Sequence, residues 1–335
     1  MKAALFKDLG KPLVIETVAD PAPEAGEVVI RVGRCGICGS DLHLTGNPHH
    51  LAPSGKILGH EWAGEVVEIG RGVSRIKKGD RVAVLPLSSC GQCASCLAGE
   101  PAWCASRAID GGGYAEFAKT HERQCFALPK SLSLEDGALV EPMAVGLHGV
   151  AISGMEPGAR VLVIGAGPIG LATIFWAHRL GAGTIAVTAS SRRRESLATD
   201  MGADIFLDPA RDMVQAAAEA LDGPPDIVFE CVGAPGLIEN AITAVRRRGT
   251  VIVLGLCWDP DTFTPGLAVG KEVRIQCAGF YSAREFEHAI DPFDRGNVAP
   301  RAMVTDTVSL AQFPTAFEAL RERTHQCKVM LNPWS

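Results

Sequence analysis

The sequence lacks any long hydrophobic run. No stretch of its 335 residues reaches the roughly 20 consecutive apolar residues that a membrane-spanning helix needs. A signal-peptide-like segment is also missing from the amino terminus, because residues 1–8 alternate apolar and polar side chains like a first strand. We therefore expect a cytoplasmic protein with no membrane partner.

An excess of positive charge is absent as well. The formal net charge is -6 at pH 7, so we expect no general attraction for nucleic acid or anionic lipid. Any phosphate recognition then belongs to a local site. The chain length suits two domains of common size, and two domains usually leave a cleft in which a substrate can bind.

Cysteine, by contrast, is plentiful, with 11 residues. In a long cytosolic chain thiols stay reduced, and metal binding becomes a more common use than disulfide formation. Four cysteines lie between Cys90 and Cys104, and two more form the pair Cys35 and Cys38. We expect the remaining five to be small core residues: Cys125, Cys231, Cys257, Cys277 and Cys327.

The hydrophobic pattern changes along the chain. Short alternating runs separated by Gly, Pro and Asp fill the first third, which is typical of antiparallel sheet: residues 27–32, 64–69 and 80–85. From about residue 159, apolar strands alternate with helical stretches, which predicts a doubly wound parallel sheet: residues 160–164, 184–188, 227–229 and 250–254. A helix over 310–320 and a strand over 328–331 are expected near the end of the chain.

Cys90, Cys93, Cys96 and Cys104 have a spacing that can surround a tetrahedral ion. Four thiolates leave zinc no open position, so this site is predicted to be structural. Two alternatives are a coincidental cluster of free thiols and a nucleic-acid-binding zinc module. The flanking segment 97–103 has none of the basic residues that such a module would need.

A second set of residues suits an open, catalytic zinc site. Cys38, His60 and a carboxylate from Glu61 or Glu141 would give three protein ligands and one exchangeable position. Zinc in that position would act as a Lewis acid that lets an alcohol lose its proton near neutral pH. The alternatives for Cys35 and Cys38 are a second zinc ribbon or a redox pair.

Taken in order, the run 36–43, the run 59–61, the four cysteines and a later glycine-rich turn resemble the zinc-containing medium-chain alcohol dehydrogenases over essentially the whole chain. The stretch 140–148, with glutamate where the best-known animal enzymes have cysteine, looks like the polyol dehydrogenase branch.

The resemblance implies roles for individual residues. Cys38 and His60 match the first two zinc ligands, while Glu61 and Glu141 both remain candidates for the third. Glu61 either moves onto the metal during turnover or orients another ligand without binding the metal. Pro142 suits the first turn of a helix, which would put Glu141 at the helix start and at the domain junction. Ser40 and His43 match the family's proton relay, although His43 alone could also be an ordinary surface histidine.

A glycine-rich turn follows the strand 160–164 and opens a helix over 169–180. Glycines at the first two positions allow pyrophosphate to approach backbone N–H groups, and the third allows close packing on the sheet. Packing alone is the alternative explanation for the glycines. The predicted turn residues are Gly165, Gly167, Pro168, Ile169 and Gly170, with Val232 and Leu254 at later strand ends bordering the ribose and nicotinamide.

The strand 184–188 ends without the acidic residue that an NAD enzyme uses to bind the ribose hydroxyls. Ala189 takes that place, and the residues that follow suit a 2′-phosphate: Ser190, Ser191, Arg192, Arg193 and Arg194. We therefore predict NADP(H) preference over NAD(H). The alternative is a solvated helix start, and on the family pattern Arg194 could instead cover the adenine.

The sequence as a whole predicts a zinc-dependent dehydrogenase of a small alcohol or ketone, with one catalytic and one structural zinc. By resemblance it has a GroES-like catalytic domain (1–148 and 286–335), a Rossmann domain (149–285), and a homodimeric or homotetrameric assembly. Two alternatives are a zinc-free quinone or enoyl reductase of the same fold and a non-catalytic NADPH-binding protein.

Overall fold

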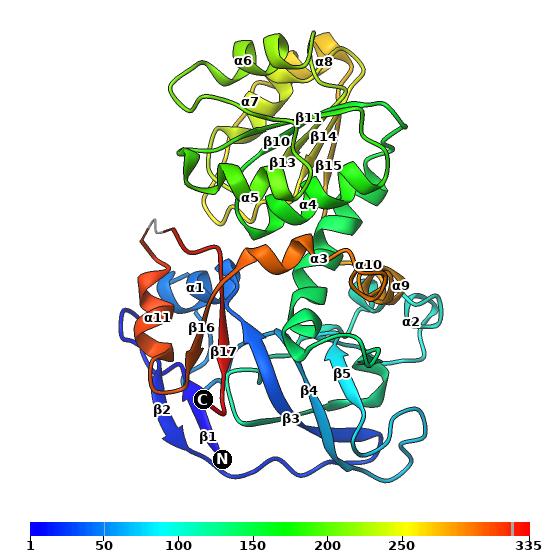
Figure 1. The fold of residues 1–335 in the computed structure, drawn as a ribbon, viewed down its shortest axis with the longest axis vertical. Helices are drawn as coiled ribbons and strands as arrows, with labels where there is room; N and C mark the ends of the chain where they lie inside the picture. Colours follow the sequence, from blue (N-terminus) through cyan, green and yellow to red (C-terminus); the bar gives the residue numbers. More distant parts are fainter. Residues whose placement is uncertain (50, 323–324) are drawn as a thin grey trace. The chain divides into compact units, whose positions relative to one another are not determined.

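The computed structural model describes residues 1–49, 51–322 and 325–335 (Figure 1). Tertiary contacts divide the chain into two compact units: unit 1 is Met1–Glu141 with Ser282–Ser335, and unit 2 is Pro142–Tyr281. The first division falls inside helix α3 (Leu134–Ile152). The boundaries expected at residues 148 and 285 each lie a few residues further along the chain. Among the described residues, no helix is long and apolar enough to cross a membrane.

Unit 1 is built on a seven-stranded sheet whose pairings are antiparallel, except that β16 and β17 are parallel. The order is β16-β17-β3-β4-β5-β9, and β8 also pairs with β3. The strands are β3 (Glu27–Gly36), β4 (Glu61–Ile69), β5 (Arg81–Val84), β8 (Phe117–His121), β9 (Cys125–Ala127), β16 (Val304–Ser309) and β17 (Lys328–Asn332). The predicted strands in this half lie within or overlap these elements.

Alternation along β3 explains how this sheet packs. Val28, Ile30 and Val32 are fully buried at every second position and join the main hydrophobic cluster of unit 1. The same strand pairs with β4 so that Gly36 lies opposite Glu61. This register brings the residues that precede Cys38 beside the residues that follow Gly59.

Shorter elements surround the sheet, and both chain ends lie in this unit (Figure 1). The small strands are β1 (Lys2–Leu5), β2 (Val14–Thr17), β6 (Leu87–Ser88) and β7 (Ala108–Ile109). The helices are α1 (Gly39–Gly46), α2 (Ala94–Leu97), α9 (Ala283–His288), α10 (Asp291–Asp294) and α11 (Phe313–Ala319), with 3-10 turns at Pro101–Trp103, Glu122–Gln124 and Ala299–Met303.

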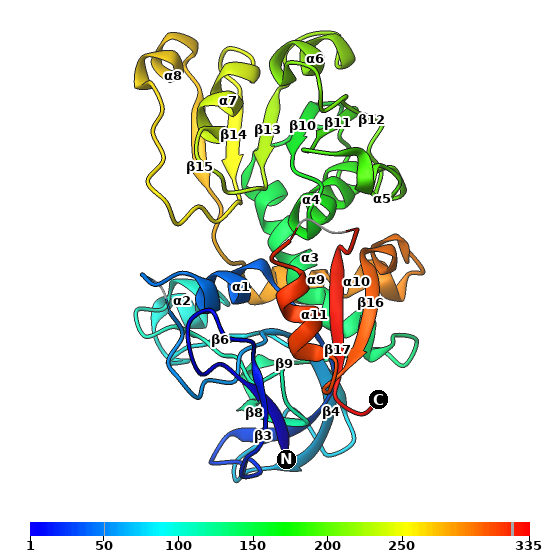
Figure 2. The ribbon, with the colours of Figure 1, turned by 90° about the vertical axis from the view of Figure 1, so that its left-hand side faces the viewer.

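Unit 2 is a Rossmann fold with six parallel strands in the order β12-β11-β10-β13-β14-β15, which Figure 2 shows side by side. The strands are β10 (Arg160–Ile164), β11 (Thr184–Thr188), β12 (Ile205–Phe206), β13 (Ile227–Glu230), β14 (Thr250–Val253) and β15 (Arg274–Cys277). The helices are α4 (Pro168–Arg179), α5 (Glu195–Asp200), α6 (Met213–Ala220), α7 (Leu237–Ala244) and α8 (Pro265–Lys271). Strand order reverses between β10 and β13, the switch point where ligands bind in such sheets.

The expected helix start at Pro142 is wrong. Helix α3 begins at Leu134 and carries Pro142 in its interior. Ser133 and Asp136 form the start, because the Asp136 N–H donates to Ser133 Oγ (3.0 Å) and the Ser133 N–H donates to Asp136 Oδ2 (2.8 Å). An interior proline typically costs about 3 kcal/mol, so packing of the surrounding helix outweighs its local preference here.

Two smaller expectations also need correction. Helix α11 starts at Phe313 rather than residue 310, because Pro314 favours the first turn. Of the five cysteines expected in the core, Cys125 and Cys327 are buried, Cys231 and Cys257 are half-buried, and Cys277 is exposed. Cys277 is exposed because β15 is an edge strand, which no neighbouring strand covers on one side in the described sheet.

Candidate active site

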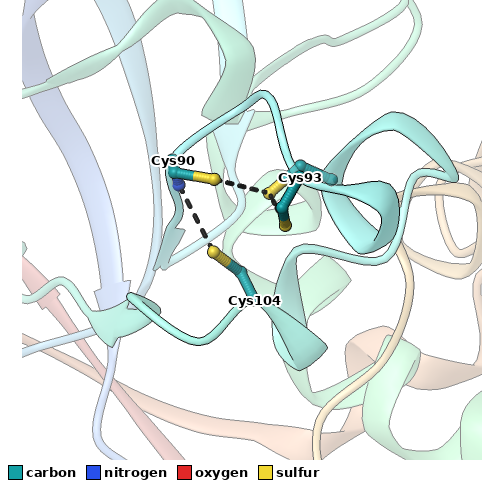
Figure 3. A group of neighbouring side chains, drawn as sticks. Cys90, Cys93 and Cys104 are labelled. Carbon is teal, nitrogen blue, oxygen red and sulfur yellow. Dashed lines mark hydrogen bonds between the residues drawn. The ribbon is translucent and has the colours of Figure 1, made fainter.

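The four-cysteine lobe is assembled by a loop with very little regular structure. Its ligand atoms all lie within 4.8 Å of one another, and Figure 3 shows the sulfurs of Cys90, Cys93 and Cys104 facing each other. The Sγ atoms of Cys93 and Cys96 are 3.5 Å apart and all four thiols are free, so no disulfide competes with metal binding. Four converging sulfurs fit a closed tetrahedral zinc site.

A backbone donor supports thiolate character at Cys104. The N–H of Cys90 donates to Cys104 Sγ at 3.5 Å (Figure 3). That contact, with help from Ser106, lowers the pKa of the Cys104 thiol to about 6. A thiol already ionised near neutral pH is the form that binds zinc.

A second ligand group lies at the end of the β3–β4 pair. Cys38 directly precedes α1, His60 directly precedes β4, and Glu61 is the first residue of β4. One ligand atom from each lies within 4.8 Å of the others. Sulfur, imidazole nitrogen and carboxylate oxygen are a donor set that suits zinc with a position left for substrate.

Glu141 does not join that group among the described residues. It is buried on α3, with 8% of its surface exposed. Cys35 also stays outside the group, and burial raises the pKa of its thiol well above the usual range. Within the part of the chain that is described, the structure thus brings Glu61, and not Glu141, to Cys38 and His60.

Asp41 orients the histidine of this group. Its Oδ1 lies 3.4 Å from His60 Nδ1, and its other oxygen accepts a 2.5 Å hydrogen bond from the Tyr114 hydroxyl. Burial alone would lower the pKa of His60, but the charges of Asp41 and Cys38 raise it well above its usual value. With Nδ1 facing Asp41, Nε2 is the nitrogen left for a metal.

Lys328 completes the surroundings of the ligand group. Its ammonium donates to both oxygens of Glu61, and both side chains are almost fully buried. Neither Asp41 nor Lys328 is among the residues predicted from the sequence. Both could have been found from the sequence. Asp41 lies within the run 36–43 that matches the family, and Lys328 is a charged residue at the start of a mostly apolar strand.

Ser40 and His43 lie on α1, immediately after Cys38. Residues three apart share one face of a helix. Ser40 is half-buried and His43 is exposed, so this face runs from the ligand group toward solvent. His50 lies outside the described residues.

The glycine turn of unit 2 follows β10 as expected. Gly165 has φ +106°, and a Cβ there would lie 2.7 Å from Val232. A side chain at Gly170 would overlap the carbonyl of Gly165, so the third glycine is needed for close packing. Val232 and Leu254 follow the neighbouring strands β13 and β14, which places them at the same sheet edge as the turn.

The arginines after β11 form a 3-10 turn, Arg192–Arg194, rather than the start of the helix itself. Arg194 reaches the glycine turn, where its Nη1 donates to the carbonyl of Ala166 at 3.3 Å. Arg192 is ion-paired with Glu195 at 2.7 Å, and Ser190 is exposed. One cationic side chain, Arg194, therefore lies next to the turn, and position 189 is an alanine rather than a carboxylate.

Comparison with known proteins agrees with both halves of the chain. Residues 24–130 match the alcohol dehydrogenase GroES-like domain, and residues 168–295 match the zinc-binding dehydrogenase domain. The fold and the ligand groups thus define a zinc-binding dehydrogenase.

Curated relatives narrow the class. Sorbitol dehydrogenase of Bacillus subtilis is 33% identical over 346 residues, covering 99% of this chain and 97% of the relative. (R,R)-butanediol dehydrogenase of the same organism is 34% identical over 349 residues, covering 99% and 100%. The chain belongs to the zinc-containing medium-chain alcohol dehydrogenase family, in its polyol dehydrogenase-like branch.

Solved structures share the whole fold. A putative zinc-binding dehydrogenase of Sinorhizobium meliloti bound to NADP has a TM-score of 0.90 and 30% identity, with 99% of each chain covered. The alcohol dehydrogenase rspB of Escherichia coli CFT073, complexed with NADH, has a TM-score of 0.90 and 27% identity, again with 99% of each chain covered. One of these two neighbours therefore contains NADP and the other NADH.

Proposed function

We propose that this enzyme interconverts a small polyol, diol or other secondary alcohol and its ketone, with NADP(H) as hydride carrier. The observation that carries the proposal is the convergence of Cys38, His60 and Glu61 within 4.8 Å. The relatives named for sorbitol and butanediol support this substrate class.

In this proposal each chain holds two zinc ions. One would be held by Cys38, His60 and Glu61 and would supply Lewis acidity at the alcohol oxygen. The other would be held by the lobe cysteines and would stabilise the loop. Ser40 would accept the alcohol proton through its hydroxyl and His43 would pass it to solvent, because the two side chains share one face of α1.

We assign the preference for NADP(H) over NAD(H) to the segment that follows β11. A carboxylate at position 189 would repel a 2′-phosphate, and Ala189 removes that repulsion. Ser190, Ser191, Arg192 and Arg193 offer hydrogen-bond donors in its place, while Arg194 is assigned to the turn and adenine side. The turn residues Gly165, Gly167, Pro168, Ile169 and Gly170 would hold the pyrophosphate, and Val232 and Leu254 would border the ribose and nicotinamide.

Replacing Arg192 and Arg193 together by alanine tests the coenzyme assignment. A charge-assisted hydrogen bond is worth about 1.5–3 kcal/mol, so NADPH affinity should fall at least about tenfold while NADH affinity stays unchanged. Fluorescence titration of both nucleotides measures this. Arg211→Ala is the control, because Arg211 is exposed in the same unit and pairs with Glu219. Unchanged NADPH affinity, or tighter binding of NADH by the unmodified enzyme, would reject NADP(H) preference.

Glu195 offers a finer test of the same assignment. Its carboxylate holds Arg192 in a 2.7 Å ion pair that a phosphate would have to share. Glu195→Gln should therefore tighten NADPH binding by a few fold, since exposed pairs contribute about 1 kcal/mol or less. A weaker complex would mean that Arg192 does not face the phosphate.

A screen of alcohols and ketones, followed by nicotinamide absorbance, tests the reaction itself. Polyols and vicinal diols should turn over in the presence of zinc. NADPH binding without turnover of any alcohol would favour a non-catalytic NADPH-binding protein, and turnover of quinones without bound zinc would favour the reductase alternative.

The remaining assignments follow the family. We assign the catalytic domain to residues 1–148 and 286–335 and the coenzyme domain to 149–285. A cytoplasmic homodimer or homotetramer is proposed, and size-exclusion chromatography with light scattering would distinguish the two assemblies.

A further inference from the structure

Lys328 is a charged side chain in the core of unit 1. It opens β17 and only 2% of its surface is exposed. Burying an ammonium group costs several kcal/mol unless its hydrogen bonds are satisfied. All three expected donors have partners, because Nζ donates to Ile37 O at 3.0 Å and to the Glu61 oxygens at 2.7 and 2.6 Å.

Its partners connect both halves of the ligand group. Ile37 directly precedes Cys38, and Glu61 directly follows His60. One ammonium therefore ties together two chain segments that each carry a metal ligand. Gly36 makes room for the pair, since a Cβ there would overlap a Glu61 oxygen and lie 3.2 Å from Lys328 Cδ.

Charge balance explains why an ammonium is tolerated there. The ammonium lies 2.7 and 2.6 Å from the two oxygens of the Glu61 carboxylate, so the buried positive charge faces a buried negative one. Asp41 is a further acidic side chain in this region. It faces His60 and accepts a hydrogen bond from the Tyr114 hydroxyl. Lys328 therefore offsets the negative charge of Glu61 and competes with a dication for this carboxylate.

We propose that Lys328 is a positioning residue that shares the Glu61 carboxylate with the catalytic zinc and so limits how strongly this ligand donates to the metal. This inference rests on the zinc site proposed above. A carboxylate held on both oxygens by Lys328 donates less charge to an ion beside it. The ion therefore stays more acidic toward an alcohol oxygen.

Four variants separate this role from a structural tie between β17 and β3. Lys328→Met removes the charge and Lys328→Arg retains it. The single variant E61Q is compared with the double variant E61Q/K328M, which lacks both charges of the pair. Lys271→Met is the matched control, because Lys271 also donates to backbone carbonyls, those of Ile242 and Thr243, but in unit 2.

Two readouts apply to the intact enzyme: zinc affinity from chelator competition, and the visible spectrum of protein with Co²⁺ at the Cys38 site. Releasing the Glu61 carboxylate from its hydrogen bonds with Lys328 should strengthen zinc binding in K328M at least about tenfold and shift the cobalt bands. K328R should stay within about threefold of the parent, and K271M should leave both readouts unchanged. In the E61Q background, K328M should change neither readout, because Lys328 acts through Glu61.

The outcomes are decisive even if K328M fails to fold, because E61Q and E61Q/K328M can then be compared. Equal zinc affinity and equal cobalt spectra in these two variants support the inference. A difference between them, or unchanged or weaker zinc binding in K328M, overturns it. Failure of the proposed zinc site is recognised separately, since cobalt bands would then be insensitive to Cys38→Ser.

Discussion

The four-cysteine lobe and the Cys38 group both collect metal-ligand side chains in unit 1, but different residues surround these ligands. The lobe takes its ligands from one loop, Cys90 to Cys104. The Cys38 group takes its three ligands from beside the paired ends of β3 and β4, and Lys328 reaches Glu61 from 267 residues away. Sulfurs surround the lobe site, whereas buried charges surround the other.

That difference matches the roles proposed for the two sites. A structural ion needs only ligands that converge, and these can come from one short loop. A catalytic ion also needs an open position, and residues that contact its ligands, here Asp41 and Lys328, can fix a histidine tautomer and adjust the charge of a carboxylate. Changes at one site should therefore affect chemistry, and changes at the other should affect stability.

The largest expected effect is a loss of turnover when a residue of the Cys38 group is replaced. His60→Ala removes a ligand of the Cys38 group, and losing about 4 kcal/mol of Lewis-acid stabilisation corresponds to roughly a 10³-fold fall in kcat. Coenzyme affinity should persist, because the proposed coenzyme residues lie in unit 2. Steady-state kinetics and NADPH titration measure both quantities, with exposed His49→Ala as control. A fall of less than tenfold would contradict the assignment.

A variant of the four-cysteine lobe should lose stability but keep its turnover. Cys93→Ser should lower the free energy of unfolding by roughly 3 kcal/mol or more, because the loop loses its metal. Folded enzyme should keep its kcat within about threefold. Thermal denaturation and kinetics test this, with exposed Cys277→Ser as the thiol control. Loss of turnover without loss of stability would reverse the roles of the two sites.

The smallest effect concerns the Asp41–His60 pair in protein stripped of metal. Folding raises the pKa of His60, so the pair stabilises fully below the unfolded value of about 6.5 and loses effect as pH rises through the folded value. Asp41→Asn should cost about 1–3 kcal/mol at pH 6 and less at higher pH. Melting temperature against pH, measured with chelator present, gives the result. A difference that does not vary with pH would mean that His60 is uncharged in the metal-free protein.

Much of this organisation was predictable because it is local. The lobe spacing, the glycine turn after β10 and the positions of Ser40 and His43 on α1 each lie within a short segment. The alternation of β3 and the apolar strands of unit 2 indicated the two sheets. The fold class is confirmed by the matching families and solved structures.

Other features depend on long-range contacts that a local pattern does not contain. Pro142 was expected to start a helix, but Ser133 and Asp136 set the true start. Cys277 was expected in the core, yet its position on an edge strand exposes it. The position of Glu61 near Cys38 and His60 depends on the register of β3 against β4, and the Lys328 contact depends on β17 lying beside β3.

Zinc content per chain tests the central claim most directly. Elemental analysis should find two zinc ions in the unmodified enzyme, one in Cys38→Ser and one in Cys93→Ser, with turnover lost only in the first variant. If Cys38→Ser retains both ions and full turnover, no catalytic metal is held by Cys38, His60 and Glu61.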